Sequence, residues 1–189
     1  MARFGMVIDT RQCVGCMDCV VACKTENDVP DGFCRDWISQ RLEGTMPDLR
    51  LTITSERCNH CDRPPCVSCC PTGASHVHEF GKVVLVDHDK CIGCKACLAS
   101  CPYGARSFVH EPVTGQKPEV PRGKGCVESC TLCVHRIDRD QIPACVEACA
   151  ATGHKAILFG NLNDPASEIA QRIASLGTTA LRPDLRLGS

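Results

Sequence analysis

Cysteine is the residue type most able to carry chemistry in this sequence, because 19 of its 189 residues are cysteines and many lie three positions apart. One group has the spacing C-x2-C-x2-C-x3-C, and a later group repeats it and is followed by Pro102. These groups are Cys13, Cys16, Cys19 and Cys23, and Cys91, Cys94, Cys97 and Cys101. Three thiolates spaced by two residues can converge from a tight loop on one iron–sulfur cluster. The fourth follows a turn of helix and points away, so we expect a second cluster within its reach.

Two further groups keep a C-x2-C start and a C-x3-C finish, with a longer gap between them. They are Cys58, Cys61, Cys66 and Cys70, and Cys130, Cys133, Cys145 and Cys149. The undisturbed spacing is that of bacterial ferredoxins, in which three cysteines bind one cluster and the fourth ligates another. Sixteen cysteines in four groups therefore predict four clusters with four thiolates each, all of them [4Fe–4S].

Disulfides and zinc are the other uses of abundant cysteine. A disulfide framework suits small secreted chains with an even count, but this count is odd and no apolar signal-peptide core precedes Cys13. Structural zinc uses C-x2-C pairs a dozen or more residues apart, which leaves the third and fourth cysteines of a tight group without a role. Spacing favours iron–sulfur clusters over both alternatives.

Several sulfur and imidazole groups lie outside this scheme. We expect Cys34, Cys69 and Cys126 to be small buried hydrophobic residues rather than ligands. His60 and His135 flank ligand cysteines, but with four complete groups we expect them to pack or form hydrogen bonds.

Bulk composition excludes other classes of protein. Aromatic residues make up only 4%, so cysteine chemistry must help to hold the fold. The formal net charge of −1 gives no electrostatic support for nucleic-acid binding. No apolar run approaches the roughly 20 residues needed to cross a bilayer. The sequence thus predicts a soluble or peripheral subunit that reaches a membrane only through a partner.

An internal repeat indicates the architecture. Ile8-Asp9 before Cys13 matches Val86-Asp87 before Cys91, at an offset of 78 residues. Apolar, β-prone residues precede each group and short helical stretches follow, with further β-prone runs at 51–54 and 157–159. We predict an α+β fold of two ferredoxin-like modules, each organised around two [4Fe–4S] clusters, with long loops.

The modules have expected boundaries. The first comprises residues 1–50 and 126–160, the second comprises 51–110, and 111–125 forms a loop that leaves the body or faces a partner. A C-terminal helix and arm occupy 161–189. Asp164 and Pro165 are its expected start, Ile169, Ile173 and Leu176 its apolar face, and Gly177 its end.

The chain resembles the four-cluster iron–sulfur subunits of molybdenum-bis-pterin oxidoreductases of the dimethyl sulfoxide reductase family. The resemblance rests on four stretches and covers nearly the whole chain. They are Cys58-Asn-His-Cys-Asp-Arg-Pro-Pro-Cys66, Cys70-Pro-Thr-Gly-Ala74, Cys101-Pro-Tyr-Gly-Ala105 and Phe159-Gly-Asn-Leu-Asn-Asp-Pro165. The opening Phe4-Gly-Met-Val-Ile-Asp9 looks most like polysulfide or thiosulfate reductases. Ala150 replaces the family's usual proline, a change that removes no ligand.

The resemblance implies that the first group pairs with the fourth and the second with the third. Cluster 1 would be held by Cys13, Cys16, Cys19 and Cys149, and cluster 2 by Cys23, Cys130, Cys133 and Cys145. Cluster 3 would be held by Cys58, Cys61, Cys66 and Cys101, and cluster 4 by Cys70, Cys91, Cys94 and Cys97.

The resemblance also implies a function: a non-catalytic subunit that relays electrons between an integral-membrane, quinone-reactive subunit and a molybdenum or tungsten bis-pterin catalytic subunit. The assembly would be a respiratory oxidoreductase of a sulfur compound, on the periplasmic face of the membrane by co-export or else on the cytoplasmic face. An electron-transfer subunit of a hydrogenase or formate dehydrogenase, a free polyferredoxin, and a zinc-binding interaction module are the alternatives.

Overall fold

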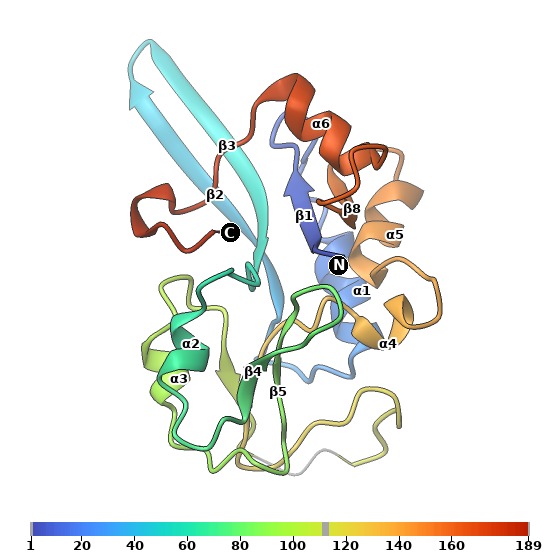
Figure 1. Ribbon diagram of the computed structural model, residues 1–189. Helices are drawn as coiled ribbons and strands as arrows, with labels where there is room; N and C mark the ends of the chain where they lie inside the picture. The colour runs from blue at the N-terminus through green and yellow to red at the C-terminus, as the bar shows by residue number, and fades with distance from the viewer. Residues whose placement is uncertain (1, 111–113, 189) are drawn as a thin grey trace.

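The computed structural model describes residues 2–110 and 114–188 (Figure 1). The elements in chain order are β1 Phe4–Ile8, α1 Asp18–Glu26, β2 Asp36–Thr45, β3 Asp48–Arg57, α2 Pro65–Ser68, β4 Ser75–Val77, β5 Val84–Val86, α3 Ala96–Ala99, β6 Ser107–Phe108, β7 Val127–Glu128, α4 Val134–Ile137, α5 Ala144–Ala151, β8 Ile157–Asn161, α6 Glu168–Leu176 and the 3-10 turn Pro183–Leu185. The mixed α and β content agrees with the predicted class. None of the described helices is long and apolar enough to span a bilayer.

Most elements gather into two groups, which we call lobes (Figure 1). In the first lobe β1 pairs antiparallel with β8, from Phe4 opposite Asn161 to Ile8 opposite Ile157, and α1 packs on α5. In the second lobe β4 pairs antiparallel with β5, and α2 packs on α3. Each lobe is thus one two-stranded sheet beside one pair of helices. The first lobe joins the two ends of the chain, whereas the sheet and helix pair of the second come from one stretch, with Val127 of β7 added to its core from further along the chain.

The lobes match at the level of single hydrogen bonds. The backbone N–H of Asp9 donates to Ala156 over 2.8 Å, and that of Asp87 donates to Ala74 over the same distance. The aspartate carbonyl then accepts from the first cysteine of the following group, over 3.1 Å from Cys13 in one lobe and from Cys91 in the other. The 78-residue repeat in the sequence therefore has a structural counterpart.

A long hairpin formed by β2 and β3 extends beyond both lobes (Figure 1). It pairs ten residues with ten, from Asp36 opposite Arg57 to Thr45 opposite Asp48. The sequence predicted only a short strand at 51–54. Its first strand was missed because Leu42 stands alone among polar residues and glycine, and this end of the strand is exposed rather than part of a core.

Cysteines form much of the core. In the first lobe Cys19, Cys145 and Cys149 pack with Ala156 and Ile157. In the second, Cys66 and Cys97 pack with Val84 and Val127. The scarcity of aromatic residues is thus matched by sulfur at the centre of each lobe.

The C-terminal helix begins later than expected. Ser167, not Asp164, is the N-cap of α6, because its Oγ accepts the backbone N–H of Ala170 over 3.3 Å. Asp164 lies in the preceding turn, where its carbonyl accepts the N–H of Ser167. Ile169 is fully buried against Gly160 of β8, so the helix packs on the first lobe.

The arm that follows α6 lies on the body of the protein. The backbone N–H of Arg63 donates to the carbonyl of Leu187 over 3.1 Å, and Arg3 donates to the carbonyl of Gly188 over 2.9 Å.

Of the expected loop 111–125, residues 111–113 lie outside the described residues. The remainder does not simply face solvent. The Lys117 Nζ donates to the Thr25 carbonyl over 2.6 Å, and both Val120 and Arg122 are buried. This part of the loop covers the first lobe beside α1.

Candidate iron–sulfur sites

The four cysteine groups share one backbone feature. The residue just before the second cysteine of each group has a left-handed conformation, with φ of 73° at Gly15, 45° at His60, 69° at Gly93 and 55° at Leu132. This conformation reverses the chain tightly and directs neighbouring cysteines to one side. Glycine adopts it without steric cost. The two non-glycine positions show that the loop geometry is kept even where the side chain opposes it.

One enclosed cavity lies in the first lobe. Four of the residues that line it are Cys23, Cys130, Cys133 and Cys145. All four cysteines are buried. The Asn27 side-chain amide donates to the sulfurs of Cys23 and Cys133 over 3.8 and 4.0 Å. The structure thus brings together the four cysteines that the resemblance assigns to cluster 2.

A second cavity lies in the second lobe and is lined by Cys70, Cys91, Cys94 and Cys97, the four cysteines expected at cluster 4. The backbone N–H of Ser75 donates to the Cys70 sulfur over 3.4 Å. Burial raises the pKa of the Cys70 thiol, but hydrogen bonds from Ser75, Thr72 and Ala74 outweigh it and leave the pKa below its usual value. Backbone donors therefore stabilise negative charge on this sulfur.

Some cysteines expected at clusters 1 and 3 are also close enough to raise one another's pKa. Cys149 acts on Cys19, and both belong to the core against which Cys13 packs. Cys16 is exposed.

In the second lobe, Cys66 and Cys101 both act on Cys58 and on Cys61. Cys58, Cys61, Cys66 and Cys101 are therefore neighbours in the second lobe.

The buried thiols are neutral unless a cation takes the place of the proton. Burial raises the pKa of Cys58 and of Cys145 to about 12, and that of Cys19 to about 11. A buried thiol with such a pKa keeps its proton at neutral pH unless a cation replaces it. Among the described residues, no three histidine, cysteine or acidic side chains meet closely enough to hold a single metal ion. A ligand set of sulfur alone, lining cavities in fours, fits cubane iron–sulfur clusters.

His60 and His135 both make polar contacts in the structure. The His60 Nδ1 accepts the backbone N–H of Val84 over 3.0 Å, and burial lowers the pKa of this imidazole to about 3, so it is neutral. The His135 Nε2 lies 2.8 Å from a carboxylate oxygen of Glu26.

Two arginines are buried among the thiols. Arg57 and Arg106 are each 7% exposed, whereas the Lys90 side chain next to Cys91 is 64% exposed. The Arg106 Nη2 donates to the Cys66 sulfur over 3.1 Å and to the Ser75 hydroxyl over 2.9 Å. In the sequence Arg57 adjoins Cys58 and Arg106 follows Cys101 by five residues, but their burial depends on packing between distant segments.

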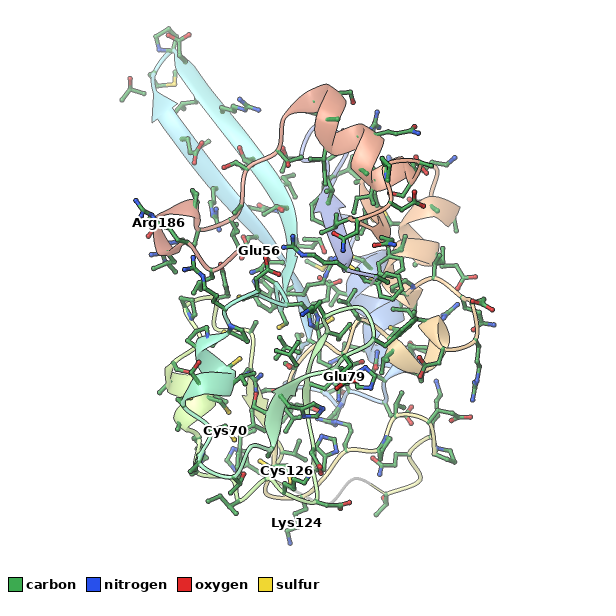
Figure 2. The ribbon with its side chains drawn as sticks, in the orientation of Figure 1. Glu56, Cys70, Glu79, Lys124, Cys126 and Arg186 are labelled. Carbon is green, nitrogen blue, oxygen red and sulfur yellow. The ribbon has the colours of Figure 1, made fainter. Side chains whose placement is uncertain are left out.

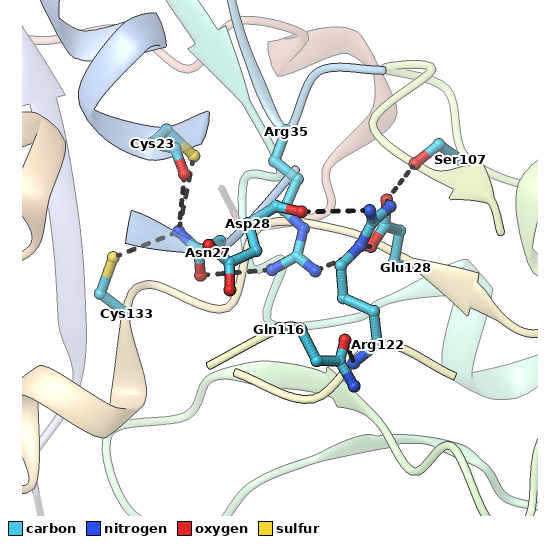
Figure 3. A network of polar contacts seen from close by, with 9 residues as sticks. All are labelled: Cys23, Asn27, Asp28, Arg35, Ser107, Gln116, Arg122, Glu128 and Cys133. Carbon is cyan, nitrogen blue, oxygen red and sulfur yellow. Dashed lines mark hydrogen bonds and ion pairs between the residues drawn. The ribbon is translucent and has the colours of Figure 1, made fainter. Parts of the chain in front are cut away.

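A buried polar network connects the lobes (Figure 3). Glu128 accepts from Arg35 over 2.7 Å, from Arg122, and from the Ser107 hydroxyl over 3.2 Å. The Arg35 Nη1 also donates to Asn27 over 3.3 Å, and Asn27 contacts the cavity sulfurs. Sequence analysis missed this network, since its members are far apart along the chain.

Only one of the three unassigned cysteines behaves as expected. Cys126 is buried and lies on the same side of the molecule as Cys70 (Figure 2). Cys34 and Cys69 are exposed, contrary to prediction. The Cys69 sulfur lies 3.2 Å from the Ser100 hydroxyl at the ends of helices α2 and α3, where there is no core to cover it.

Comparisons with known proteins agree with this chemistry. The family described as the 4Fe-4S dicluster domain matches residues 49–160. The arsenate respiratory reductase iron–sulfur subunit ArrB of Shewanella sp. strain ANA-3 is 37% identical, over 98% of this chain and 93% of the relative. A putative dimethyl sulfoxide reductase iron–sulfur subunit of Halobacterium salinarum is 38% identical, over 96% and 74%. Protein NrfC of Escherichia coli is 40% identical, over 99% and 77%.

The first two of these relatives are, by name, iron–sulfur subunits of reductases. The chain therefore belongs to the 4Fe-4S dicluster family and is an electron-transfer subunit of the dimethyl sulfoxide reductase family, with four [4Fe–4S] clusters as its cofactors.

Proposed function

We propose that the sixteen cysteines hold the clusters in the four sets implied by the resemblance. Cluster 1 takes Cys13, Cys16, Cys19 and Cys149, cluster 2 takes Cys23, Cys130, Cys133 and Cys145, cluster 3 takes Cys58, Cys61, Cys66 and Cys101, and cluster 4 takes Cys70, Cys91, Cys94 and Cys97. The two cavities support sets 2 and 4, and the effects of neighbouring thiols support sets 1 and 3.

In this proposal the two lobes are ferredoxin-like modules. One contains residues 1–50 and 126–160 and the other 51–110, as the sequence predicted. The matching strand pairs, helix pairs and hydrogen bonds at Asp9 and Asp87 favour this division. Clusters 1 and 2 occupy the first module, and clusters 3 and 4 the second.

The electron relay is supported by a difference in solvent exposure among the cysteines of the four sets. The four cysteines of set 2 are all buried, whereas Cys16 of set 1 and Cys94 of set 4 are exposed. Exposed apolar side chains flank both: Val14 and Met17 beside Cys16, and Ile92 beside Cys94. A wire needs an insulated middle and accessible ends that redox partners can cover.

Each cluster accepts or donates one electron, and the chain positions the clusters and tunes their potentials. The partners are a molybdenum or tungsten bis-pterin catalytic subunit at the cluster 1 end and an integral-membrane, quinone-reactive subunit at the cluster 4 end. The assembly is a respiratory oxidoreductase of a sulfur compound, held peripherally on the periplasmic face by export with its catalytic partner.

Native purification tests the partners, and redox-titrated electron paramagnetic resonance of the same anaerobic complex counts the clusters. We expect a large pterin-containing subunit, a membrane subunit and four titrating centres. Isolation of the native assembly without a pterin subunit would refute the proposed partners. Fewer than four centres at full occupancy would refute the ligand sets.

An electron-transfer role in a hydrogenase or formate dehydrogenase, or as a free polyferredoxin, uses the same motifs and is distinguished by what co-purifies. Metal analysis excludes the zinc alternative, because the proposal requires iron and acid-labile sulfide in place of zinc.

A further inference from the structure

We propose that Arg106 raises the reduction potentials of clusters 3 and 4. Arg57 has the equivalent position beside clusters 1 and 2, but the charge of Asp36 cancels its effect on their potentials. The inference rests on the ligand sets proposed above. It assigns different electrostatic roles to two buried arginines that the sequence could not distinguish.

Arg106 lies between the thiols of two neighbouring sets. It donates to the Cys66 sulfur of set 3 over 3.1 Å, and its charge also acts on Cys58 of set 3 and Cys97 of set 4. One guanidinium therefore faces both clusters of the second module.

No carboxylate opposes this charge. None of the ion pairs found among residues 2–110 and 114–188 includes Arg106, and the Ser75 hydroxyl that it also contacts is neutral. Its Nη1 is buried and has no hydrogen-bond acceptor in the described part of the chain. A buried donor of this kind requires an acceptor, which a cluster sulfur would provide. A positive charge held close to both clusters favours their reduced, more negative forms.

Arg57 has the equivalent place in the first module. Its charge acts on Cys19 of set 1 and on Cys130 and Cys145 of set 2. Its Nε is also buried without an acceptor among the described residues. The guanidinium thus faces both clusters of this module, as Arg106 does in the other.

The difference is the carboxylate of Asp36. It lies 3.1 and 3.2 Å from the Arg57 Nη2 and has a side chain only 1% exposed. Asp36 acts on Cys19, Cys23 and Cys145, the same neighbourhood that Arg57 influences. Opposite charges at one place largely cancel at the clusters, so the pair holds the structure and leaves the potentials nearly unchanged.

Four variants of the full chain in its native complex test this pattern: Arg106→Gln, Arg57→Gln, Asp36→Asn and the double variant Arg57→Gln/Asp36→Asn. Potentials are read by redox-titrated electron paramagnetic resonance, with iron and sulfide measured on each sample. Lys90→Gln is the matched control, because Lys90 adjoins Cys91 as Arg57 adjoins Cys58 but is exposed.

We expect Arg106→Gln to lower the equilibrium constants for reduction of clusters 3 and 4 at least tenfold. For one electron this corresponds to a fall of about 59 mV in reduction potential. Arg57→Gln lowers the potentials of clusters 1 and 2, Asp36→Asn raises them, and the double variant returns close to wild type. Lys90→Gln leaves every potential within the error of the titration. Arg106→Lys, which keeps the charge, restores most of the Arg106→Gln shift.

Two failures are distinguishable. A wild-type chain with fewer than four clusters refutes the ligand sets before any variant is compared. Full iron content in Arg106→Gln with unchanged potentials refutes the inference alone. If Arg106→Gln loses its clusters, Asp36→Asn decides: a rise in two potentials supports the inference, and no rise overturns it.

Discussion

The two lobes have the same arrangement of one sheet and one helix pair, but their helices differ in length. Helices α1 and α5 of the first lobe have nine and eight residues, whereas α2 and α3 of the second have four each. The sheet and helix pair of the second lobe come from one stretch of the sequence, but the first lobe must hold the two ends of the chain together. The comparison indicates that the split lobe needs more helix–helix packing to offset the larger cost of closing its chain.

The lobes also differ in how they enclose sulfur. All the cysteines lining the first-lobe cavity are buried, whereas the second-lobe cavity has exposed Cys94 at its edge. A fully buried ligand such as Cys130 should therefore support the fold as well as its cluster, and an exposed ligand such as Cys94 should support mainly the cluster.

The largest expected effect comes from comparing Cys130→Ser with Cys94→Ser. Each should remove or alter one cluster, with loss of up to about a quarter of the iron. Cys130→Ser should also make the first lobe sensitive to protease, because Cys130 lies in the enclosed cavity. Iron analysis and limited proteolysis under anaerobic conditions measure both effects. Equal protease sensitivity of the two variants would contradict the difference between the lobes.

The next largest effect is expected from breaking the polar network that joins the lobes. Glu128→Gln leaves the buried side chains of Arg35 and Arg122 without their carboxylate, which should cost about 3–5 kcal/mol. The unfolding midpoint in denaturant, with clusters intact, measures the loss. Glu147→Gln is the control, because this carboxylate is 60% exposed and pairs with Arg136 at the surface. A Glu128→Gln protein as stable as the control would show that the network does not join the lobes energetically.

Equivalent glycines of the repeat should respond unequally. Both Gly15→Ala and Gly93→Ala place a side chain at positive φ, at a cost of about 1–2 kcal/mol. The new Cβ at Gly93 would also meet the backbone oxygen of Gly125 at 2.2 Å, whereas at Gly15 it would meet only a methyl group of Ile53 at 3.2 Å. Gly93→Ala should therefore have a midpoint of thermal unfolding well below that of Gly15→Ala. The reverse order would contradict the contact described at Gly93.

The smallest effects are expected at two ion pairs in equivalent places of the repeat, whose cations are exposed although the Asp9 side chain is only 5% exposed and that of Asp87 28%. Arg11 pairs with Asp9 at 2.7 Å and Lys90 with Asp87 at 2.8 Å, and both cationic side chains are mostly exposed. Solvent screens such pairs, so Arg11→Ala and Lys90→Ala should both unfold within a few degrees of wild type. A large loss of thermal stability in either variant would show that the cation stabilises the charge of the aspartate. Backbone donors such as the Arg11 and Asp89 N–H groups would then be insufficient.

Local patterns in the sequence predicted much of this arrangement. β-prone residues located β1, β3, β5 and β8, and the repeat at Asp9 and Asp87 predicted matching strands and loops. Such features depend on neighbours a few positions apart, which the sequence states directly.

Features set by distant contacts were less accessible. The start of α6 was misplaced because Asp164 and Ser167 are both good caps, and packing of Ile169 on β8 selects between them. The exposure of Cys34 and Cys69 and the burial of Arg57 and Arg106 depend on which segments meet in space. Composition and spacing contain no such information.

The pairing of β1 with β8 imposes an order on synthesis. The ribosome has released α2, β4, β5 and α3 as one uninterrupted stretch long before β8 emerges, so these elements can pack while the first lobe is still half made. Until residues near Ile157 are translated, β1 has no strand to pair with. The sheet and helix pair of the second lobe can therefore form before the sheet of the first, and the core of the second lobe is completed when Val127 follows.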